Sequence, residues 1–489
     1  MTAKRIGLFL GPLLFLLTYL FIHPPGLSTA GTAVLAVTVW TAVWWITEAI
    51  PIAVTSLLPM ILFPLTGVLT APAATAAYGH YIVFLFLGGF ILAMAFERWN
   101  LHRRIALATI YFIGSNPRMI ILGAMLATAL LSMWISNTAT SVMMLPIAMA
   151  IAKQLRDDPN TKEDENAIFG KALMLAIAYA ASIGGMGTLI GTPVNMVLVG
   201  QVETVFNVQI GFLEWFKIGF PVSMVLLFLC WWYLTRIAFQ FPATEFTGGR
   251  AEIRRLQQEQ GPITQEEIKV LIVFSLTAIA WIIRKSVLVN IFPNINDTVI
   301  AMIGATLLFL IPGGKKGASL LSWSEAVKLP WGVVLLLGGG FALAAGFSAS
   351  GLADWIASTL TVPESIGFLV VILIVVAAVN FLTEVTSNVA TTSMLLPVLA
   401  AAALPLQVHP YALMIPATLA ATCAFMLPVA TPPNAVVFGS GYLTIPDMVR
   451  AGFRMNLLSI ILIALVGYLL LPLVWDFDIG TLPEWVGGE

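Results

Sequence analysis

Two short polar motifs interrupt apolar sequence at matching places in the two halves of the chain. Ser136–Thr140 reads Ser-Asn-Thr-Ala-Thr, and Ser387–Thr391 reads Ser-Asn-Val-Ala-Thr, 251 positions later. Oxygens of Ser, Thr and Asn suit a hard cation such as sodium, and free N–H groups at a helix start suit an anion. Polar breaks that recur in two halves indicate the binding site of a membrane transporter.

A second pair of breaks follows the first. Gly191–Asn195 reads Gly-Thr-Pro-Val-Asn, and Ala430–Asn434 reads Ala-Thr-Pro-Pro-Asn, 239 positions later. Proline lacks an N–H and clashes with the preceding turn, so the carbonyl groups before it are left free. One Ser-Asn pair alone would be a helix cap or an interhelical hydrogen bond. Two pairs in register, each followed by a Thr-Pro break, favour a binding site near the membrane midplane.

The composition is that of an integral membrane protein. Of 489 residues, 59% are hydrophobic and 10% are charged, with a mean hydropathy of +0.97. Soluble domains carry about 25% charged residues. Long apolar stretches predict transmembrane helices, and the short alternating segments of a barrel are absent. The net charge of −1 says nothing about partners, but the lack of a basic run predicts no nucleic-acid partner. Cys230 and Cys423 lie in apolar segments without a disulfide pattern.

Apolar length and breaks at Gly, Pro and charged residues predict an all-α polytopic fold with about eleven crossings. The expected crossings are residues 6–22, 30–47, 51–68, 81–97, 172–200, 214–238, 268–289, 297–312, 331–348, 411–440 and 453–474. Two further apolar segments, 119–150 and 366–403, are interrupted by the Ser-Asn motifs. We interpret each as a re-entrant hairpin with its motif at the tip; two ordinary kinked helices are the alternative.

The positive charges support this topology. With the N-terminus in the cytoplasm and both hairpins returning to their own side, 20 of the 23 Lys and Arg residues face inward, and only Lys217, Arg284 and Lys285 face outward. That asymmetry follows the positive-inside rule. We therefore expect a multi-pass protein of the cell (inner) membrane, with a cytoplasmic N-terminus, a retained first helix and an external C-terminus.

The repeat extends beyond the motifs and divides the chain. Leu87–Phe90 matches Leu337–Phe341, with Phe90 and Phe341 again 251 positions apart. An odd number of crossings per half makes the two repeats inverted in topology. The polar segment between the halves predicts either an amphipathic surface helix or a plain linker. The expected parts are an N-terminal helix (1–29), a first inverted repeat (30–240), a cytoplasmic connector (241–267), a second inverted repeat (268–474) and an external tail (475–489).

Acidic residues inside the membrane would indicate proton coupling. Glu48 and Glu97 fall at helix ends, whereas Glu384 precedes Ser387 by three residues, where the first half has Met133. Glu384 is therefore expected either to support the second tip or a cation, or to make a buried structural hydrogen bond. Enzyme signatures such as His-Glu-x-x-His or a phosphate-binding loop are absent, so no enzyme function is predicted.

The paired motifs, together with Phe425–Val437, closely resemble the divalent-anion/sodium symporter family of sodium-coupled dicarboxylate, citrate and sulfate transporters. The resemblance covers almost the whole chain. It implies a homodimer in the lipid membrane, in which a transport domain moves like an elevator against a scaffold domain. It also implies bound sodium ions and a dicarboxylate substrate.

The resemblance further implies the site residues. The first sodium site carries over to Ser132, Ser136, Asn137 and Gly191, and the second to Thr383, Thr386, Asn388 and Ala430. The substrate carboxylates are expected between them, on Asn137, Thr138, Asn388, Thr431 and Pro432. The family pattern is often Ser-Asn-Thr at both tips, whereas this chain has Val389 at the second tip. No Arg or Lys lies in the four motifs, so amides, hydroxyls, helix dipoles and sodium would hold the anion.

The sequence thus predicts a secondary active transporter that imports C4-dicarboxylates such as succinate, malate and fumarate with sodium. A sodium-independent dicarboxylate exchanger, a citrate transporter and a sulfate transporter are alternatives within the same fold. An anion channel is the alternative from another class, and it would require an open polar pore.

Overall fold

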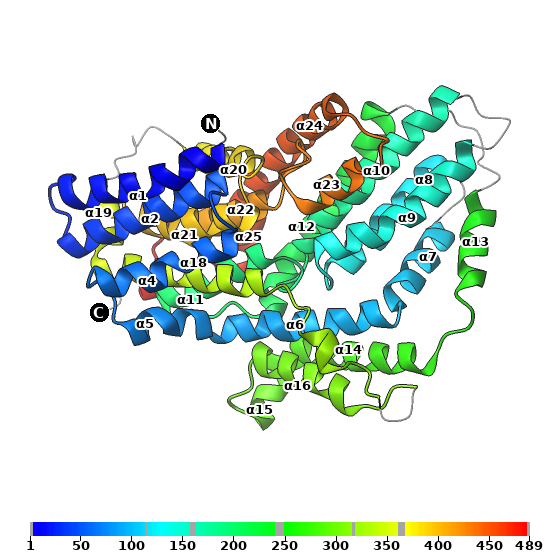
Figure 1. The fold of residues 1–489 in the computed structure, drawn as a ribbon, viewed down its shortest axis with the longest axis horizontal. Coiled ribbons are helices and arrows are strands. Elements are labelled where there is room, and N and C mark those ends of the chain that lie inside the picture. The colour runs from blue at the N-terminus through cyan, green and yellow to red at the C-terminus, as the bar shows by residue number, and fades with distance from the viewer. Residues whose placement is uncertain are drawn as a thin grey trace.

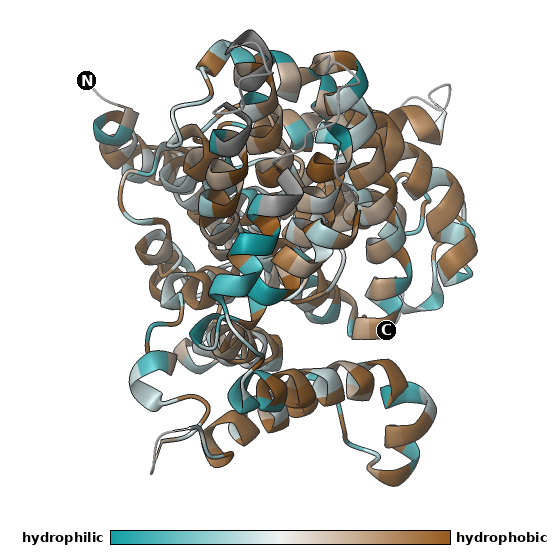
Figure 2. Cartoon of the chain, turned by 90° about the vertical axis from the view of Figure 1, so that its right-hand side faces the viewer, coloured by the Kyte–Doolittle hydropathy of each residue, from teal (hydrophilic) through white to brown (hydrophobic). Residues whose placement is uncertain are grey.

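The chain is helical throughout the part that the computed structural model describes, which is residues 3–113, 116–156, 163–239, 249–314, 318–359 and 367–486. Within these ranges the sole β-type pairing is an isolated bridge between Pro312 and Ser319. Among the described residues, eight helical spans, some made of consecutive helices, are long and apolar enough to cross a membrane: Ala3–Phe21, Thr29–Thr47, Ala71–Arg98, Ala167–Gly185, Phe212–Ala238, Gln265–Ile291, Trp331–Ser350 and Ile445–Trp475. The predicted all-α membrane fold is confirmed, and hydrophobic residues cover most of each long helix (Figure 2).

Both predicted hairpin segments are interrupted at their motifs. Helix α8 (Pro117–Ser132) and helix α9 (Asn137–Arg156) are separated by residues 133–136, and α20 (Phe368–Leu382) and α21 (Asn388–Ala403) by residues 383–387. The Ser136 hydroxyl accepts a hydrogen bond from Ala139 N at 3.2 Å, which caps the start of α9. That both pairs return to the side from which they came stays a prediction.

The segments with Thr-Pro breaks are divided as well. Helix α10 (Glu163–Gly185) is followed by α11 (Pro193–Phe206), and α22 (Tyr411–Ala421) is followed by α23 (Pro432–Phe438). Each second helix begins on its proline, whose fixed φ and missing N–H suit the first helical position. The loops between these helices leave backbone groups for other partners.

Helix starts follow the sequence repeat. Helix α7 (Leu101–Ile113) and helix α19 (Leu352–Thr359) begin 251 positions apart, as do α8 and α20, and α9 and α21. Helices α11 and α23 begin 239 positions apart. Helices α7 and α19 were absent from the predicted crossings, because both are short and α7 carries His102, Arg103 and Arg104 in its first turn.

Two other segments differ from simple expectation. The predicted crossing 51–68 is divided into α3 (Ile52–Thr55) and α4 (Leu58–Leu65), with prolines at positions 51, 59 and 64. The connector contains helix α13 (Gly249–Glu259), whose Ile253 and Leu256 are buried where α13 packs against α7 and α9. Residues 240–248 of the connector and 487–489 of the tail lie outside the described residues.

The remaining helices complete the two halves. They are α1 (Ala3–Phe21), α2 (Thr29–Thr47), α5 (Ala71–Ala76), α6 (Tyr81–Arg98), α12 (Phe212–Tyr233), α14 (Gln265–Ile283), α15 (Val289–Ile291), α16 (Asp297–Leu310), α17 (Trp323–Ala326), α18 (Trp331–Ser350), α24 (Ile445–Leu465) and α25 (Leu471–Trp475). Helices α8, α9 and α10 form one layer of neighbours, and α6 packs on α16 (Figure 1).

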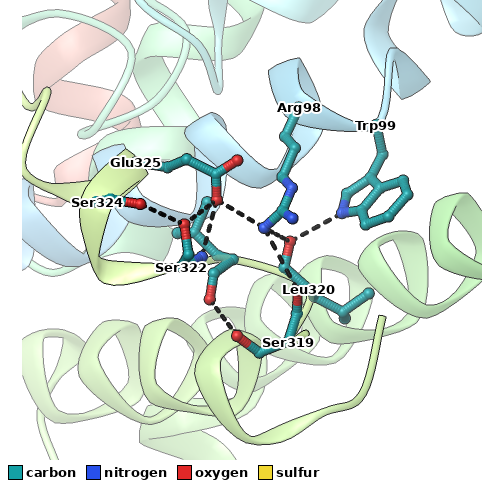
Figure 3. A network of polar contacts seen from close by, with 8 residues as sticks. Arg98, Trp99, Ser319, Leu320, Ser322, Ser324 and Glu325 are labelled. Atoms are coloured by element: carbon teal, nitrogen blue, oxygen red, sulfur yellow. Dashed lines mark hydrogen bonds and ion pairs between the residues drawn. The ribbon is translucent and has the colours of Figure 1, made fainter. Parts of the chain in front are cut away.

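A polar network fixes the end of α6, just before the chain turns into α7 (Figure 3). Arg98 Nη1 donates to Glu325 Oε2 at 2.6 Å and to Leu320 O at 3.0 Å. Trp99 Nε1 donates to the same Leu320 carbonyl at 2.8 Å. These contacts attach the end of α6 to the segment around Leu320 and Glu325. They thereby fix the position at which α7 begins.

Candidate functional site

Four breaks in helices carry the predicted site residues. We call residues 132–138 and 383–389 the first and second tips, and residues 186–192 and 422–431 the first and second loops. Helix α9 packs against α23, and α21 packs against α11, so the helix that leaves each tip lies on the broken helix of the other half. Each half of the site therefore contacts the other half through these helices.

Oxygen atoms gather at the first tip. Ser132 Oγ lies 2.7 Å from Ala181 O and 2.7 Å from Asn137 Oδ1. The same atom of the Asn137 amide lies 3.2 Å from Ala181 O and 3.3 Å from Gly191 O. The inward end of this amide therefore meets oxygen atoms only, one from the tip, one from α10 and one from the first loop.

This cluster has two chemical solutions. With its nitrogen turned inward, the Asn137 amide donates to Ser132 Oγ, Ala181 O and Gly191 O. With its oxygen turned inward, four oxygens converge and need a cation between them. Hard cations take such sets of hydroxyl, amide and backbone carbonyl oxygens, and unwound helices in transporters provide them. The amide can therefore serve both states, with and without an ion.

The second tip has a similar arrangement: Thr383 and Asn388 are equivalent to Ser132 and Asn137, and the carbonyl that the hydroxyl meets belongs to Ala421, one residue past the position equivalent to Ala181. Thr383 Oγ1 lies 2.7 Å from Asn388 Oδ1 and 3.0 Å from Ala421 O. A hydroxyl has one proton and can donate to only one of these two acceptors at a time. Thr383 is fully buried, so its hydroxyl has no access to bulk water.

The other predicted sodium residues are placed differently. The hydroxyl of Thr386 donates to Leu382 O at 2.8 Å and contacts Thr391 Oγ1 at 2.5 Å. Its oxygen thus already serves the helix end. Ala430 lies at the position equivalent to Gly191 and donates from its N–H to Leu427 O at 3.2 Å. Ser136 caps α9, as described above.

Two buried asparagines shape the loops. Asn195 Nδ2 donates to Thr188 O at 2.7 Å and to Gly185 O at 3.2 Å. Asn434 Nδ2 donates to Leu427 O at 3.0 Å and to Ala424 O at 3.1 Å. All of these positions match across the halves at 239 residues. The sequence marked both asparagines as parts of motifs, but it did not reveal this role.

Glu384 is the main difference between the halves. Its Oε1 accepts hydrogen bonds from Phe425 N at 2.7 Å, Asn456 Nδ2 at 2.8 Å and Met426 N at 2.9 Å, and its Oε2 accepts from Leu427 N at 3.1 Å. The residue is 3% exposed. Of the two expected roles, these contacts match the buried structural hydrogen bond: Glu384 holds the second loop by its backbone N–H groups.

In the first half, the loop is attached to the tip by an uncharged side chain. Met133 stands in place of Glu384, and its backbone carbonyl accepts a hydrogen bond from the Thr188 hydroxyl. That hydroxyl also accepts from Gly191 N at 3.1 Å. A neutral threonine thus connects the first loop to the first tip, whereas a carboxylate connects the second loop to the second tip.

The helix starts differ in the donors that they leave free: α21 begins with residues that carry N–H groups, whereas α23 begins with Pro432 and Pro433, which carry none, and Asn434 N already donates to Thr431 O at 3.0 Å. The residues that precede α11, α21 and α23, namely Thr192, Ser387 and Thr431, make no side-chain cap. Uncapped N–H groups at a helix start attract negative charge. Among the predicted substrate residues, Thr138 and Pro432 are exposed, Asn137 and Asn388 are half-buried, and Thr431 is buried.

A cavity of about 320 Å³ lies beside the first tip. It is bounded by the turn between α6 and α7 and by one face of α9: Glu97, Asn100, His102, Ile135, Ala139, Thr140, Val142 and Met143. None of the predicted site residues lines it. The buried Thr140 hydroxyl, which has no hydrogen-bond partner in the described structure, belongs to this cavity.

Comparison with known proteins gives consistent matches. The family model described as the sodium:sulfate symporter transmembrane region matches residues 3–475. The sodium-dependent dicarboxylate transporter SdcS of Staphylococcus saprophyticus is 49% identical over 483 residues, which cover 98% of this chain and 93% of that protein. SdcS of Staphylococcus aureus strain USA300 is 48% identical over 483 residues, with the same coverage.

Two solved structures share the fold at low identity. Neisseria gonorrhoeae MtrF, described with a class of antimetabolite efflux pumps, has a TM-score of 0.58 and 10% identity, over 98% of this chain and 96% of that one. The Alcanivorax borkumensis YdaH transporter has a TM-score of 0.54 and 15% identity, over 83% of this chain and 88% of that one.

Proposed function

This chain belongs to the sodium:sulfate symporter family, and from that membership we propose that it is a secondary active transporter that imports C4-dicarboxylates with sodium. Succinate, malate and fumarate are the proposed substrates. The names of the relatives that are 48–49% identical support sodium coupling and dicarboxylate transport. The observation that carries the proposal is the clustering of oxygens at equivalent positions of the two tips.

The first proposed sodium site consists of Ser132, Asn137 and Gly191, with Ser136 at its edge. The Ala181 carbonyl, which the sequence did not indicate, joins this set because it lies within 3.2 Å of the Asn137 amide. The second proposed site consists of Thr383, Asn388 and Ala430, and the Ala421 carbonyl joins it because it lies 3.0 Å from the Thr383 hydroxyl. Thr386 is the weakest member, since its hydroxyl already has two partners.

The proposed substrate position lies between the tips. Asn137 and Asn388 would each hold one carboxylate, together with Thr138, Thr431, Pro432 and the backbone N–H groups that follow Ser387. Bound sodium ions next to both asparagines would offset the two negative charges, since the motifs contain no Arg or Lys. Because each asparagine contacts both an ion and the substrate, sodium would bind weakly without the dicarboxylate, and the dicarboxylate would bind weakly without sodium.

The transport cycle is proposed to follow the elevator mechanism in a homodimer, with both tips and loops in the moving domain. The dense packing of α8, α9 and α10 on one another, and of α20 and α21 on α22, supports a single rigid body around the site. The N-terminus is proposed to be cytoplasmic and the C-terminus external, in the cell (inner) membrane.

Uptake into proteoliposomes tests this function. Labelled succinate should enter only when an inward sodium gradient is imposed, and uptake should saturate with succinate. Excess malate or fumarate should compete, whereas citrate and sulfate should compete weakly. Uptake without sodium that requires internal dicarboxylate would instead identify an exchanger. Uptake that does not saturate would identify a channel.

The topology gives a separate prediction. Single cysteines at Lys153 and Asp478, both exposed, should be labelled by an impermeant thiol reagent from the cytoplasmic and the external side, respectively. The two native cysteines are buried, so the wild-type protein is the blank. Labelling of position 153 from outside would rule out the first hairpin.

The tip hydroxyl gives another prediction. Thr138→Val should weaken succinate transport by roughly ten- to a hundredfold, because a hydrogen bond to a charged group is worth about 1.5–3 kcal/mol. Val389→Thr, at the equivalent position of the second tip, is the matched control and should be tolerated or bind more tightly. Uptake titrations with succinate, malate and citrate measure both. Wild-type affinity in Thr138→Val would remove this hydroxyl from the substrate site.

A further inference from the structure

One backbone carbonyl in each loop accepts a hydrogen bond from a side chain, and the two side chains come from different halves of the chain. Met186 and Phe425 occupy equivalent positions, 239 residues apart. The Met186 carbonyl accepts a hydrogen bond from Trp215 Nε1 at 3.0 Å, within the first half. The Phe425 carbonyl accepts from the Tyr179 hydroxyl at 2.9 Å, and Tyr179 belongs to the other half. The second loop is therefore held partly by the first half, whereas this carbonyl of the first loop is held by its own half.

The contact made by Tyr179 has no counterpart in the second half. It lies on α10, is fully buried, and its ring packs on that of Phe425 at a centroid distance of 4.9 Å. Thr418 occupies the equivalent position on α22, and its hydroxyl donates to Met414 O of its own helix at 2.8 Å. The second half thus has no equivalent link at this position to the first loop.

The Tyr179 hydroxyl lies between contacts that lead to the first tip and contacts that lead to the second tip. On one side, Tyr179 lies two residues before Ala181, whose carbonyl accepts from Ser132 at the first tip. On the other side, Phe425 N donates to Glu384, which directly follows Thr383 of the second tip. A polar path therefore runs from the first tip through α10 to the second loop and the second tip.

We propose that the Tyr179 hydroxyl is a positioning residue that couples the two tips. Ion binding at the first tip fixes the Ala181 carbonyl and with it this part of α10. Tyr179 then holds the Phe425 carbonyl, so that the second loop is in place for the second ion. The two sites are thereby linked in affinity, and such a link acts in both directions. This inference rests on the sodium-coupled function proposed above.

Tyr179→Phe tests the link because it removes one oxygen atom and keeps the ring. Sodium-dependent succinate uptake is measured over a range of sodium concentrations in wild type, Tyr179→Phe and Tyr78→Phe. Tyr78 is the matched control, since its hydroxyl also donates to a backbone carbonyl, Ser56 O, far from the loops in sequence. We expect Tyr179→Phe to transport with a Hill coefficient close to one and a several-fold higher half-saturating sodium concentration.

The control should keep the wild-type sodium curve. An unchanged Hill coefficient and half-saturation in Tyr179→Phe would overturn the link while leaving sodium coupling intact. Wild-type uptake that ignores sodium would instead contradict the proposed function, and this result appears before any variant is compared. The two failures are therefore distinguishable.

A second measurement does not depend on the folding of that variant. Hydrogen exchange of peptides covering residues 422–431 is compared with and without sodium, in wild type and in Ser132→Ala. The link predicts that sodium protects the second loop in wild type, and that Ser132→Ala, at the first tip, reduces this protection severalfold. Equal protection in both proteins would show that the two halves bind independently.

Discussion

Asn137→Ala is expected to reduce sodium-driven succinate uptake by at least about a hundredfold. The inward end of this amide lies among the oxygens of Ser132, Ala181 and Gly191, and its loss removes one ion ligand and one substrate donor together. Each contact with a charged group is worth about 1.5–3 kcal/mol, and 1.4 kcal/mol is a factor of ten. Initial uptake rates into proteoliposomes measure the effect.

Two companion variants separate the roles of the amide. Asn388→Ala should have the same effect, because Asn388 contacts Thr383 in the same way at the second tip. Asn137→Asp keeps an oxygen for sodium but adds a negative charge, and it should lose succinate more than sodium. Asn290→Ala, at an exposed asparagine, is the control for expression and melting temperature. Normal sodium activation in Asn137→Ala would remove this residue from the site.

Glu384→Gln is expected to reduce uptake by about tenfold or more. In the wild type, Oε2 accepts a hydrogen bond from Leu427 N–H. A glutamine oxygen at the Oε1 position would keep the three hydrogen bonds made there, but the amide nitrogen would then face the Leu427 N–H, and two donors cannot pair. A buried donor left without a partner costs about 1–3 kcal/mol, and the loss of the charge weakens the other three bonds. The second loop, and with it Ala430 next to Thr431, would move.

The first half suggests how to rescue this defect. Glu384→Met alone leaves the donors of the second loop unpaired and should be nearly inactive. Adding Leu427→Thr recreates the Met133–Thr188 pair of the first half, in which a hydroxyl donates to a backbone carbonyl. The double variant should therefore transport better than Glu384→Met. If the single and double variants were equally inactive, the charge of Glu384 rather than its geometry would be required.

Much of the architecture was predictable because short motifs mark the helix breaks in both repeats. Ser-Asn at a tip and Thr-Pro at a broken helix act on their own backbone, so the interruptions at Asn137, Asn388, Pro193 and Pro432 followed from residue type alone. Short helices were harder to predict. Helix α7 is short and begins with charged residues, so it was not predicted as a crossing, whereas residues 51–68 have the apolar length of a crossing but are divided at their prolines.

The contacts within the site were less predictable, because their partners lie far apart in sequence and are backbone groups. Glu384 was a candidate from its place before the second tip, yet its partners are N–H groups about forty positions away. The carbonyls of Ala181 and Ala421 carry no residue-type signal at all. Tyr179 lies on an apolar helix and resembles any packing residue until its partner is known.

The central claim is that ion and dicarboxylate share the same tips. Titration calorimetry of succinate into the purified protein, at increasing sodium with choline keeping the ionic strength constant, tests it most directly. Shared ligands require that sodium raise the affinity for succinate, and linkage requires the reverse as well. We expect the succinate Kd to fall at least tenfold as sodium rises to saturation. The same Kd in choline alone would contradict the account.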